Sequence, residues 1–293
     1  MHLKKVFTTF LFQCLFVFLN AQQGNSPWET VAPANSFVYT DLKTAIKDAT
    51  VCYRLDLSNA DFLALKKVLP KAAALTNVMA FRLGNNKLSS IPSVFLEMHS
   101  LLYFQSVGNP LTTLSDSLGM WSELHFLELA NTKFDTLPEG IYGCTKLQSI
   151  SIFGNVDTLH ITKAISSLGK SLMELKIYNT KIDTLPDNLA SLSKLHKVVL
   201  YKCGLHVIPK EVLKMNQINE LWLDSNSISI IPREIFSMPA LTYLSLSGNR
   251  ITHVPSTICF LKNLNVLDLR GNPIDPYEIH VVQALLPNCR IIF

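Results

Sequence analysis

Large aromatic side chains recur at nearly even intervals in the second half of the sequence, and charged side chains accompany them. The aromatic residues are Phe153, Tyr178, Tyr201, Trp222 and Tyr243, and the charged residues near them include Lys176, Lys197 and Asp224. Exposed aromatic rings with charges alongside are what protein interfaces use as anchors, and sugar rings can stack on the same surfaces. The chemistry that these residues offer is therefore binding rather than bond cleavage.

Residues suited to catalysis or metal binding show no comparable arrangement. The sequence contains no H-E-x-x-H, G-x-S-x-G or Walker-type glycine-rich motif, and its histidines fall at unrelated positions. The cysteines are scattered and include no C-x-x-C pair, which argues against a zinc or redox site. We therefore expect no enzymatic activity, no cofactor and no metal.

The bulk composition narrows the class of protein further. With 293 residues and 48% hydrophobic content, the chain can bury a sizeable core. Its net charge is only +4, and two of the positive charges, Lys4 and Lys5, belong to an N-terminal segment that we expect to be removed. Such a weak and dispersed charge does not indicate nucleic-acid binding.

The aromatic residues owe their spacing to a repeat of about 23 residues. Its first apolar residue, position 1, is Cys52, Val78, Leu101, Leu124, Leu147, Leu172, Leu195, Ile218, Leu241 and Leu264 in successive units. Positions 4, 6, 11 and 14 are also apolar, as in Leu221, Leu223, Ile228 and Ile231, and position 15 is proline in six units. The alternation around positions 4 and 6 predicts a short, half-buried strand in every unit.

This unit is similar to that of the leucine-rich repeat family, L-x-x-L-x-L-x-x-N/C-x-L, in the 23-residue subtype that continues with Leu-Pro-x-x-Ile/Leu. The resemblance extends from residue 52 to about residue 275. It implies an α/β solenoid, a leucine-rich repeat horseshoe with about ten parallel strands on its concave side and helical or irregular segments on its convex side. For function, the resemblance implies a recognition scaffold without enzymatic activity.

Position 9 follows the strand at the point where the chain turns inward. Its occupants are Asn86, Asn109, Thr132, Asn155, Thr180, Cys203, Asn226, Asn249 and Asn272. A buried turn leaves backbone groups without water, and a short amide side chain can both donate and accept hydrogen bonds. We therefore predict a ladder of these side chains along the solenoid, with Cys203 as a member of the ladder rather than a nucleophile.

The aromatic residues listed first fall at positions that point away from the core. Because positions 4 and 6 face inward, positions 3, 5 and 7 face the concave surface. Phe153, Tyr178 and Tyr201 occupy position 7, Trp222 position 5 and Tyr243 position 3, which predicts a diagonal stripe across five strands. Tyr103 and Phe126, at position 3 of adjacent units, form a smaller pair. An exposed apolar patch favours a binding site, whereas the alternative is that the rings merely stack and stiffen the sheet.

The beginning of the chain resembles a secretory signal. Lys4 and Lys5 precede a mostly apolar run over residues 6–19, and Ala21 offers a small residue before a cleavage site. The run is too short to span a bilayer, and no later segment has enough consecutive apolar residues to do so. We expect residues 1–21 to be removed on export, which places the protein outside the cell, in the periplasm or on the cell surface.

The remaining chain divides into three parts. Residues 22–50 are predicted to be an N-terminal leader, loose to about residue 39, followed by a capping helix over residues 41–49. The repeats occupy residues 51–275, and residues 276–293 are expected to form a C-terminal cap with a final helix. Within the longer unit that begins at Leu147, apolar residues at helical spacing predict a true helix over residues 161–168.

These observations favour an exported scaffold that binds an unidentified protein through its concave face. The alternatives are a glycan-binding or adhesion protein that uses the same aromatic stripe, and a structural surface protein. The sequence does not choose between these functions, because leucine-rich repeats share a fold and not a ligand.

Overall fold

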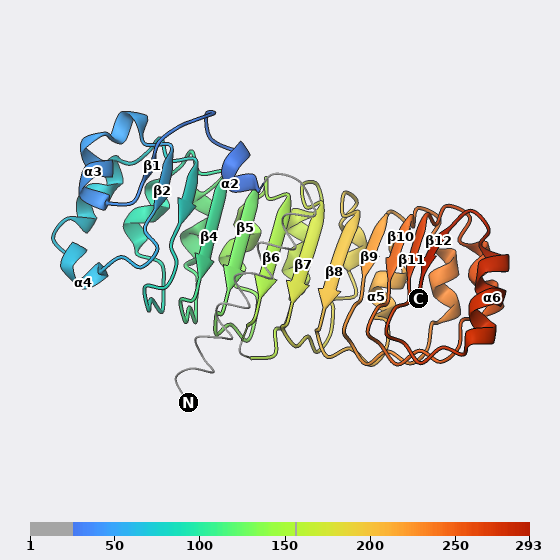
Figure 1. Cartoon of the computed structure of the whole chain (residues 1–293). Helices are drawn as coiled ribbons and strands as arrows, with labels where there is room; N and C mark the ends of the chain where they lie inside the picture. Colours follow the sequence, from blue (N-terminus) through green and yellow to red (C-terminus); the bar gives the residue numbers. More distant parts are fainter. Residues whose placement is uncertain (1–25, 156) are drawn as a thin grey trace.

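The repeats build one sheet. In the computed structural model, which describes residues 26–155 and 157–293, twelve parallel strands are hydrogen-bonded to one another in sequence order (Figure 1). The strands are β1 Val38–Tyr39, β2 Arg54–Asp56, β3 Ala80–Arg82, β4 Tyr103–Val107, β5 Phe126–Ala130, β6 Ser149–Phe153, β7 Glu174–Tyr178, β8 Lys197–Tyr201, β9 Glu220–Trp222, β10 Tyr243–Ser245, β11 Val266–Asp268 and β12 Arg290–Ile292. The predicted solenoid is confirmed, with two strands more than the expected ten, because β1 and β12 extend the sheet beyond the repeats.

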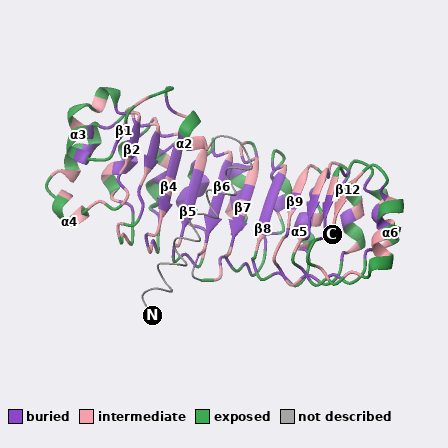
Figure 2. Cartoon of the chain, in the orientation of Figure 1, coloured by how far each residue is buried: buried purple, intermediate pink, exposed green. Residues whose placement is uncertain are grey.

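Equivalent positions of successive units lie opposite one another across the sheet. Ile150 pairs with Leu175, and Leu175 pairs with Val198, so these position-4 side chains stack in the core behind the sheet. The core cluster runs continuously from Tyr39 to Leu286. Figure 2 shows the strands largely buried and the loops largely exposed. Each unit therefore buries its apolar face against its neighbours, as expected for a repeat array.

Short helical turns lie behind the sheet. The 3₁₀ turns are η1 Ala49–Val51, η2 Leu69–Ala74, η3 Ser93–Glu97, η4 Asp116–Met120, η5 Glu139–Gly143, η6 Lys163–Leu168, η7 Leu189–Ser191, η8 Arg233–Ser237 and η9 Ser256–Phe260. The α-helices are α2 Pro27–Thr30, α3 Leu42–Lys47, α4 Phe62–Leu65, α5 Lys210–Leu213 and α6 Pro276–Leu285. No helix among the described residues is long and apolar enough to span a bilayer.

The predicted helix over residues 161–168 is wrong in type. The segment forms the 3₁₀ turn η6, whose Ile165 and Leu168 are fully buried between η5 and η7. The apolar spacing was correct for core contact. However, a 3₁₀ turn covers more length per residue than an α-helix, so a short segment can cross the back of its unit.

The N-terminal leader is also more ordered than predicted. Residues 1–21, interpreted as a signal peptide, lie outside the described residues, but residues 26–39 contain α2 and β1. The capping helix is α3, whose first turn is capped by Asp41 through the Thr44 N–H at 2.8 Å. Trp28 of α2 is only 3% exposed, so the leader packs against the sheet instead of remaining loose.

Position 8, which lies one to three residues beyond the end of each strand, has a left-handed backbone in all ten units. Its φ angle ranges from 46° at Asn179 to 69° at Gly108. Glycine and asparagine adopt this conformation most readily, and they fill position 8 in eight units. Lys202 and Ser225 are the exceptions. The left-handed residue turns the chain from the strand into the buried loop that begins at position 9.

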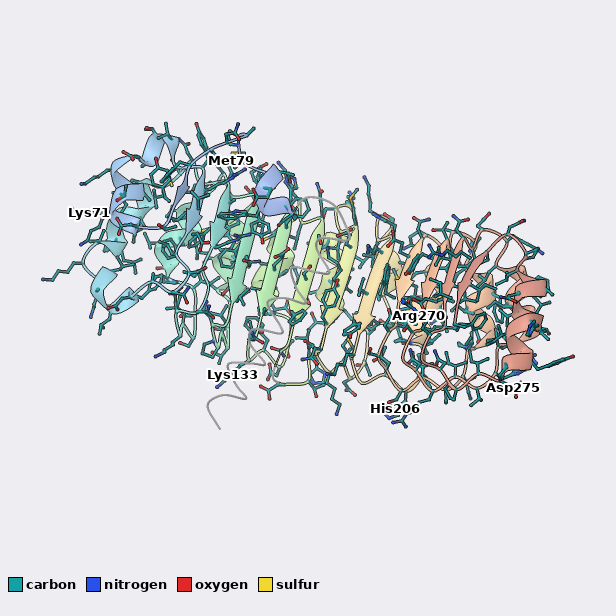
Figure 3. All side chains as sticks on the ribbon, viewed as in Figure 1. Lys71, Met79, Lys133, His206, Arg270 and Asp275 are labelled. Carbon is teal, nitrogen blue, oxygen red and sulfur yellow. The ribbon has the colours of Figure 1, made fainter. Side chains whose placement is uncertain are left out.

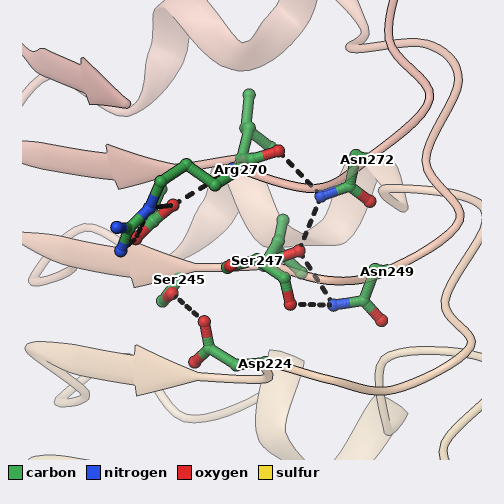
Figure 4. Close-up of polar contacts among 9 residues, drawn as sticks. Asp224, Ser245, Ser247, Asn249, Arg270 and Asn272 are labelled. Carbon is green, nitrogen blue, oxygen red and sulfur yellow. Dashed lines mark hydrogen bonds and ion pairs between the residues drawn. The ribbon is translucent and has the colours of Figure 1, made fainter. Parts of the chain in front are cut away.

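The side chains at position 9 make the hydrogen bonds that this loop needs. Asn249 accepts from the Ile228 N–H at 3.0 Å and donates to the Leu223 and Leu246 carbonyls at 2.9 and 2.8 Å. Asn272 repeats the pattern one unit later and accepts from the Ile251 N–H at 2.9 Å. Figure 4 shows its amide nitrogen donating to the Leu246 and Leu269 carbonyls, at 2.8 and 2.9 Å. Each amide therefore connects its own unit to the preceding one.

Substitutes at position 9 make fewer contacts. The Cys203 thiol lies 3.4 Å from the Ile177 carbonyl, and the Cys203 N–H donates to Asn226 at 2.9 Å. Thr132 donates to Asn155 at 2.7 Å, while Thr180 accepts from the Asn155 N–H at 3.0 Å. By comparison, Asn109, a regular asparagine of the ladder, donates to the Leu83 carbonyl at 2.5 Å. At the start of the array, the Asn86 Oδ1 atom has no hydrogen-bond partner, since the preceding unit forms α4 at the equivalent place.

Two glycines bring neighbouring turns on the outer side close together. A Cβ atom built on Gly143 would lie 2.9 Å from the Gly119 Cα, and one on Gly119 would lie 3.2 Å from the Gly143 Cα. These residues belong to η5 and η4, which pack directly against each other. A side chain at either position would force the two turns apart.

Asn249→Ala tests the hydrogen-bond ladder. The substitution leaves the buried Ile228 N–H without an acceptor, and we expect a loss of about 3 kcal/mol in the free energy of unfolding. Urea unfolding measures this loss, with Asn265→Ala as the control, because Asn265 is an exposed asparagine of the following unit. Equal, small effects of the two substitutions would contradict a stabilising role for the ladder.

Candidate functional site

The structure brings the predicted aromatic stripe together on the concave face. Phe153, Tyr178 and Tyr201 lie side by side at the ends of β6, β7 and β8, with ring centroids 5.7 and 6.3 Å apart. Trp222 and Tyr243 stack on β9 and β10, with centroids 4.2 Å apart and an interplanar angle of 20°. The period-2 pattern thus placed all five rings on the correct side of the sheet.

Two of these rings are not exposed as predicted. Phe153 is 4% exposed and Tyr178 is 8% exposed, because each ring is covered by its neighbours and by Ala130 and Val199. Burial raises the pKa of the Tyr178 hydroxyl well above its usual range. The partly exposed residues are Tyr201, Trp222 and Tyr243, which we call the aromatic platform. Phe153 and Tyr178 therefore fit the alternative interpretation of the stripe, in which the rings pack on one another and stiffen the sheet.

The lysines beside the stripe are engaged in ion pairs on the sheet. Lys176 lies 2.7 Å from Glu174, and Lys197 lies 2.9 Å from Glu220, which also accepts from the Trp222 Nε1–H at 3.1 Å. The Lys197 ammonium is 5.5 Å from the centroid of the Trp222 ring. Burial opposes ionisation of Glu174, but Lys176, Ser149 and Lys197 together hold its pKa below the usual value. These pairs fix the lysine side chains within the sheet.

Asp224 has a different environment at the end of β9. Its carboxylate accepts a hydrogen bond from the Ser245 hydroxyl, and among the ion pairs of the described residues it takes part in none (Figure 4). Burial raises the pKa of Asp224; the Ser245 hydrogen bond opposes this rise, and nearby Asp268 adds to it. Asp268 itself binds the Arg270 guanidinium at 2.5 to 3.1 Å. Figure 3 shows Arg270 over the C-terminal strands.

The second predicted aromatic pair is not available as a surface. Tyr103 is fully buried, with its ring 6.0 Å from that of Trp28 and its hydroxyl donating to Glu128 at 2.8 Å. Phe126 is partly buried at the edge of the same cluster. The prediction of an exposed Tyr103 is wrong because α2 lies against β4 (Figure 1).

The leader is attached to the sheet by two arginines. The Arg82 guanidinium lies 4.0 Å from the centroid of the Trp28 ring, and Arg54 donates to the Glu29 carbonyl at 2.8 Å. Sequence reasoning missed Trp28, because it lies outside the repeat and nothing in its neighbourhood indicates which strands it contacts. The N-terminal part of the concave face is therefore filled by the chain itself.

The described residues offer little reactive chemistry. Residues 26–155 and 157–293 contain no group of three or more histidine, cysteine, aspartate or glutamate side chains that could hold a metal ion. Burial raises the pKa of the Cys144 and Cys203 thiols to about 12. These two thiols are therefore protonated at neutral pH and are poor nucleophiles. His206 lies exposed on a loop at the edge of the sheet (Figure 3).

Asp224→Asn tests the burial of this carboxylate. Because the folded state raises the pKa of Asp224, the ionised carboxylate destabilises the fold at neutral pH, and this effect disappears as the pH falls through that pKa. Asparagine can still accept from Ser245. We expect a higher Tm at neutral pH and no difference from the parent near about pH 4, with thermal unfolding as the measurement.

Glu234→Gln, an equal change of charge at an exposed residue of η8, is the control. An equal shift of Tm in both variants, or a gain for Asp224→Asn that persists in acid, would contradict destabilisation of the fold by the buried, ionised carboxylate.

Comparison with known proteins agrees with the repeat architecture of the chain. A family model described as leucine rich repeat matches residues 193–251 and again residues 216–274. No curated protein is significantly similar to the chain in sequence.

Solved structures of similar fold come from bacteria and plants. An internalin, inlF, from Listeria monocytogenes has a TM-score of 0.65 at 21% identity and covers 88% of this chain and 73% of that chain. The plant peptide hormone receptor RGFR1, solved in complex with RGF2, has a TM-score of 0.56 at 21% identity, with coverage of 81% and 38%.

The leucine-rich repeat ectodomain of the receptor kinase GASSHO1/SCHENGEN3 from Arabidopsis thaliana, solved in complex with CASPARIAN STRIP INTEGRITY FACTOR 2, has a TM-score of 0.52 at 24% identity, with coverage of 75% and 30%. This chain thus spans less than half of either plant receptor chain. At these identities the likeness concerns the fold. The family model matches residues 193–274, and the repeat register and the similar structures extend the likeness over the array, so this chain has the leucine-rich repeat fold.

Proposed function

We propose that the protein is an exported, non-enzymatic scaffold that binds a protein partner through the concave surface of β7–β11. The observation that carries this proposal is the aromatic platform of Tyr201, Trp222 and Tyr243, whose rings remain partly exposed on a rigid sheet. Partly exposed aromatic residues held in fixed positions are typical anchors of protein interfaces. Because the sheet is already ordered, binding would carry little ordering cost.

Two further observations support the proposal. The equivalent surface at β3 and β4 is already occupied by Trp28, so the concave face of this chain accommodates an aromatic side chain of another segment. The plant receptors of similar fold were solved in complex with their partners RGF2 and CASPARIAN STRIP INTEGRITY FACTOR 2. Fold alone does not transfer a ligand, so the weight rests on the platform.

A glycan-binding function is the second candidate. The flat stack of Trp222 on Tyr243 lies beside Glu220 and Asp224, whose carboxylates could accept hydrogen bonds from sugar hydroxyls. A structural surface protein is the remaining alternative and would bind itself rather than a ligand. The two triple-alanine variants described next distinguish these three functions.

The test compares capture of extracellular proteins by the parent and by two triple-alanine variants. The first variant replaces Tyr201, Trp222 and Tyr243. The control replaces Val207, Phe260 and Tyr277, which are 68%, 62% and 77% exposed and lie off the strands. We expect the parent and the control to retain the same partner, and the platform variant to lose affinity by roughly 30-fold or more.

Equal capture by all three proteins would contradict a binding site on the concave face. Capture that simple sugars abolish, or binding to a glycan array that only the platform variant loses, would favour the glycan function. Self-association of the parent without any captured ligand would favour a structural role.

Export is a separate part of the proposal and rests on residues 1–21. Cleavage after Ala21 makes Gln22 the first residue of the exported protein. We expect N-terminal sequencing of protein recovered outside the cytoplasm to begin at Gln22. Recovery of the uncleaved chain inside the cells alone would contradict export.

A further inference from the structure

Among the described residues, the carboxylate of Asp224 lies beside the platform and takes part in no ion pair. On β7 and β8, Lys176 and Lys197 are held by Glu174 and Glu220. Each of these carboxylates lies within 3 Å of its lysine, so neither lysine is available to a more distant anion. The positive charges that β7 and β8 place beside the platform are therefore neutralised within the sheet.

The C-terminal side of the platform repeats this pairing. Arg270 donates to Asp268 through both Nε and the terminal nitrogen, and Asp268 is only 2% exposed. Asp224 is within electrostatic reach of Arg270, yet its carboxylate accepts from the neutral Ser245 hydroxyl and, among the described residues, forms no ion pair. One negative charge thus remains at the C-terminal end of β9.

Aromatic faces lie next to this charge. Asp224 lies two residues beyond Trp222, the last residue of β9, so both side chains point to the concave side, and the Trp222 ring stacks on Tyr243. Burial raises the pKa of the Tyr243 hydroxyl to about 12, and the nearby carboxylates of Asp268 and Asp224 contribute to this rise. A carboxylate beside an aromatic face is the combination that receives an arginine or lysine side chain.

The chain uses both of these contacts internally. Arg82 lies over the face of Trp28 at 4.0 Å, and Arg270 binds Asp268 through two nitrogens. Cation–aromatic and guanidinium–carboxylate contacts are therefore both present on this concave face. At Asp224 the carboxylate and the rings are both present, and among the described residues Asp224 makes no ion pair with a cation.

We propose that Asp224 and the Trp222–Tyr243 stack receive a basic side chain, preferably an arginine, from the bound protein partner. The inference rests on the proposed function and adds the chemical character of the partner: a segment that presents a guanidinium or ammonium group to the C-terminal end of β9. A stacked, charge-paired arginine is a more specific anchor than an apolar contact, because its planar group fits the ring face and the carboxylate at once.

In the test, a library of random, displayed dodecapeptides is selected for binding to the full protein. The selected peptides are then synthesised, and their affinities are measured by fluorescence anisotropy. We expect the selected peptides to share a basic residue. Replacing that residue by glutamine, or Asp224 by asparagine, should each weaken binding about tenfold, and the two losses should not add. Glu234→Gln, the matched change of charge on η8, should leave the affinity unchanged.

Several results would overturn the inference. Selected peptides without a shared basic residue would do so, as would equal affinities for the parent and Asp224→Asn. If Trp222→Ala abolishes binding while Asp224→Asn does not, the concave interface stands and the cationic anchor fails. If no selected peptide depends on Trp222, the proposed interface fails together with the anchor.

Discussion

Every unit of this solenoid turns inward immediately after its strand, and the backbone of that buried turn needs hydrogen-bond partners that water does not supply. The amide at position 9 provides them and reaches back into the preceding unit, as Asn249 does through Ile228 and Leu223. Because each turn is connected to its predecessor in this way, the strands stay in register. The register in turn aligns the side chains of the concave face.

The sequence predicted the parts of the fold that depend on this repeated register. Strands, core positions and the side of the sheet for each ring all follow from local periodicity, as Ile150, Leu175 and Val198 illustrate. The leader was not predicted, because the contact of Trp28 with Tyr103 joins segments that are distant in sequence. The left-handed residue at position 8 had a signal in its asparagines and glycines, which the apolar pattern alone overlooked.

The candidate site was predictable in composition but not in exposure. Periodicity placed Tyr178 and Trp222 on one face, yet the burial of Tyr178 depends on the packing of its neighbours' rings. The pairing of Lys197 with Glu220 likewise joins adjacent units and follows only from the aligned strands. The distinctive environment of Asp224 emerges once these pairs are known, since it is defined by the charges already engaged around it.

The close approach of Gly119 and Gly143 has a consequence for the concave face. The curvature of a repeat array depends on how far the spacing of units on the outer side exceeds that on the strand side. Small residues that reduce the outer spacing make the arc locally flatter, and a bulkier residue would bend it more sharply. The radius of the binding surface is thus set partly by two residues on the opposite side of the molecule. Evolution could reshape that surface without replacing any residue that touches a ligand.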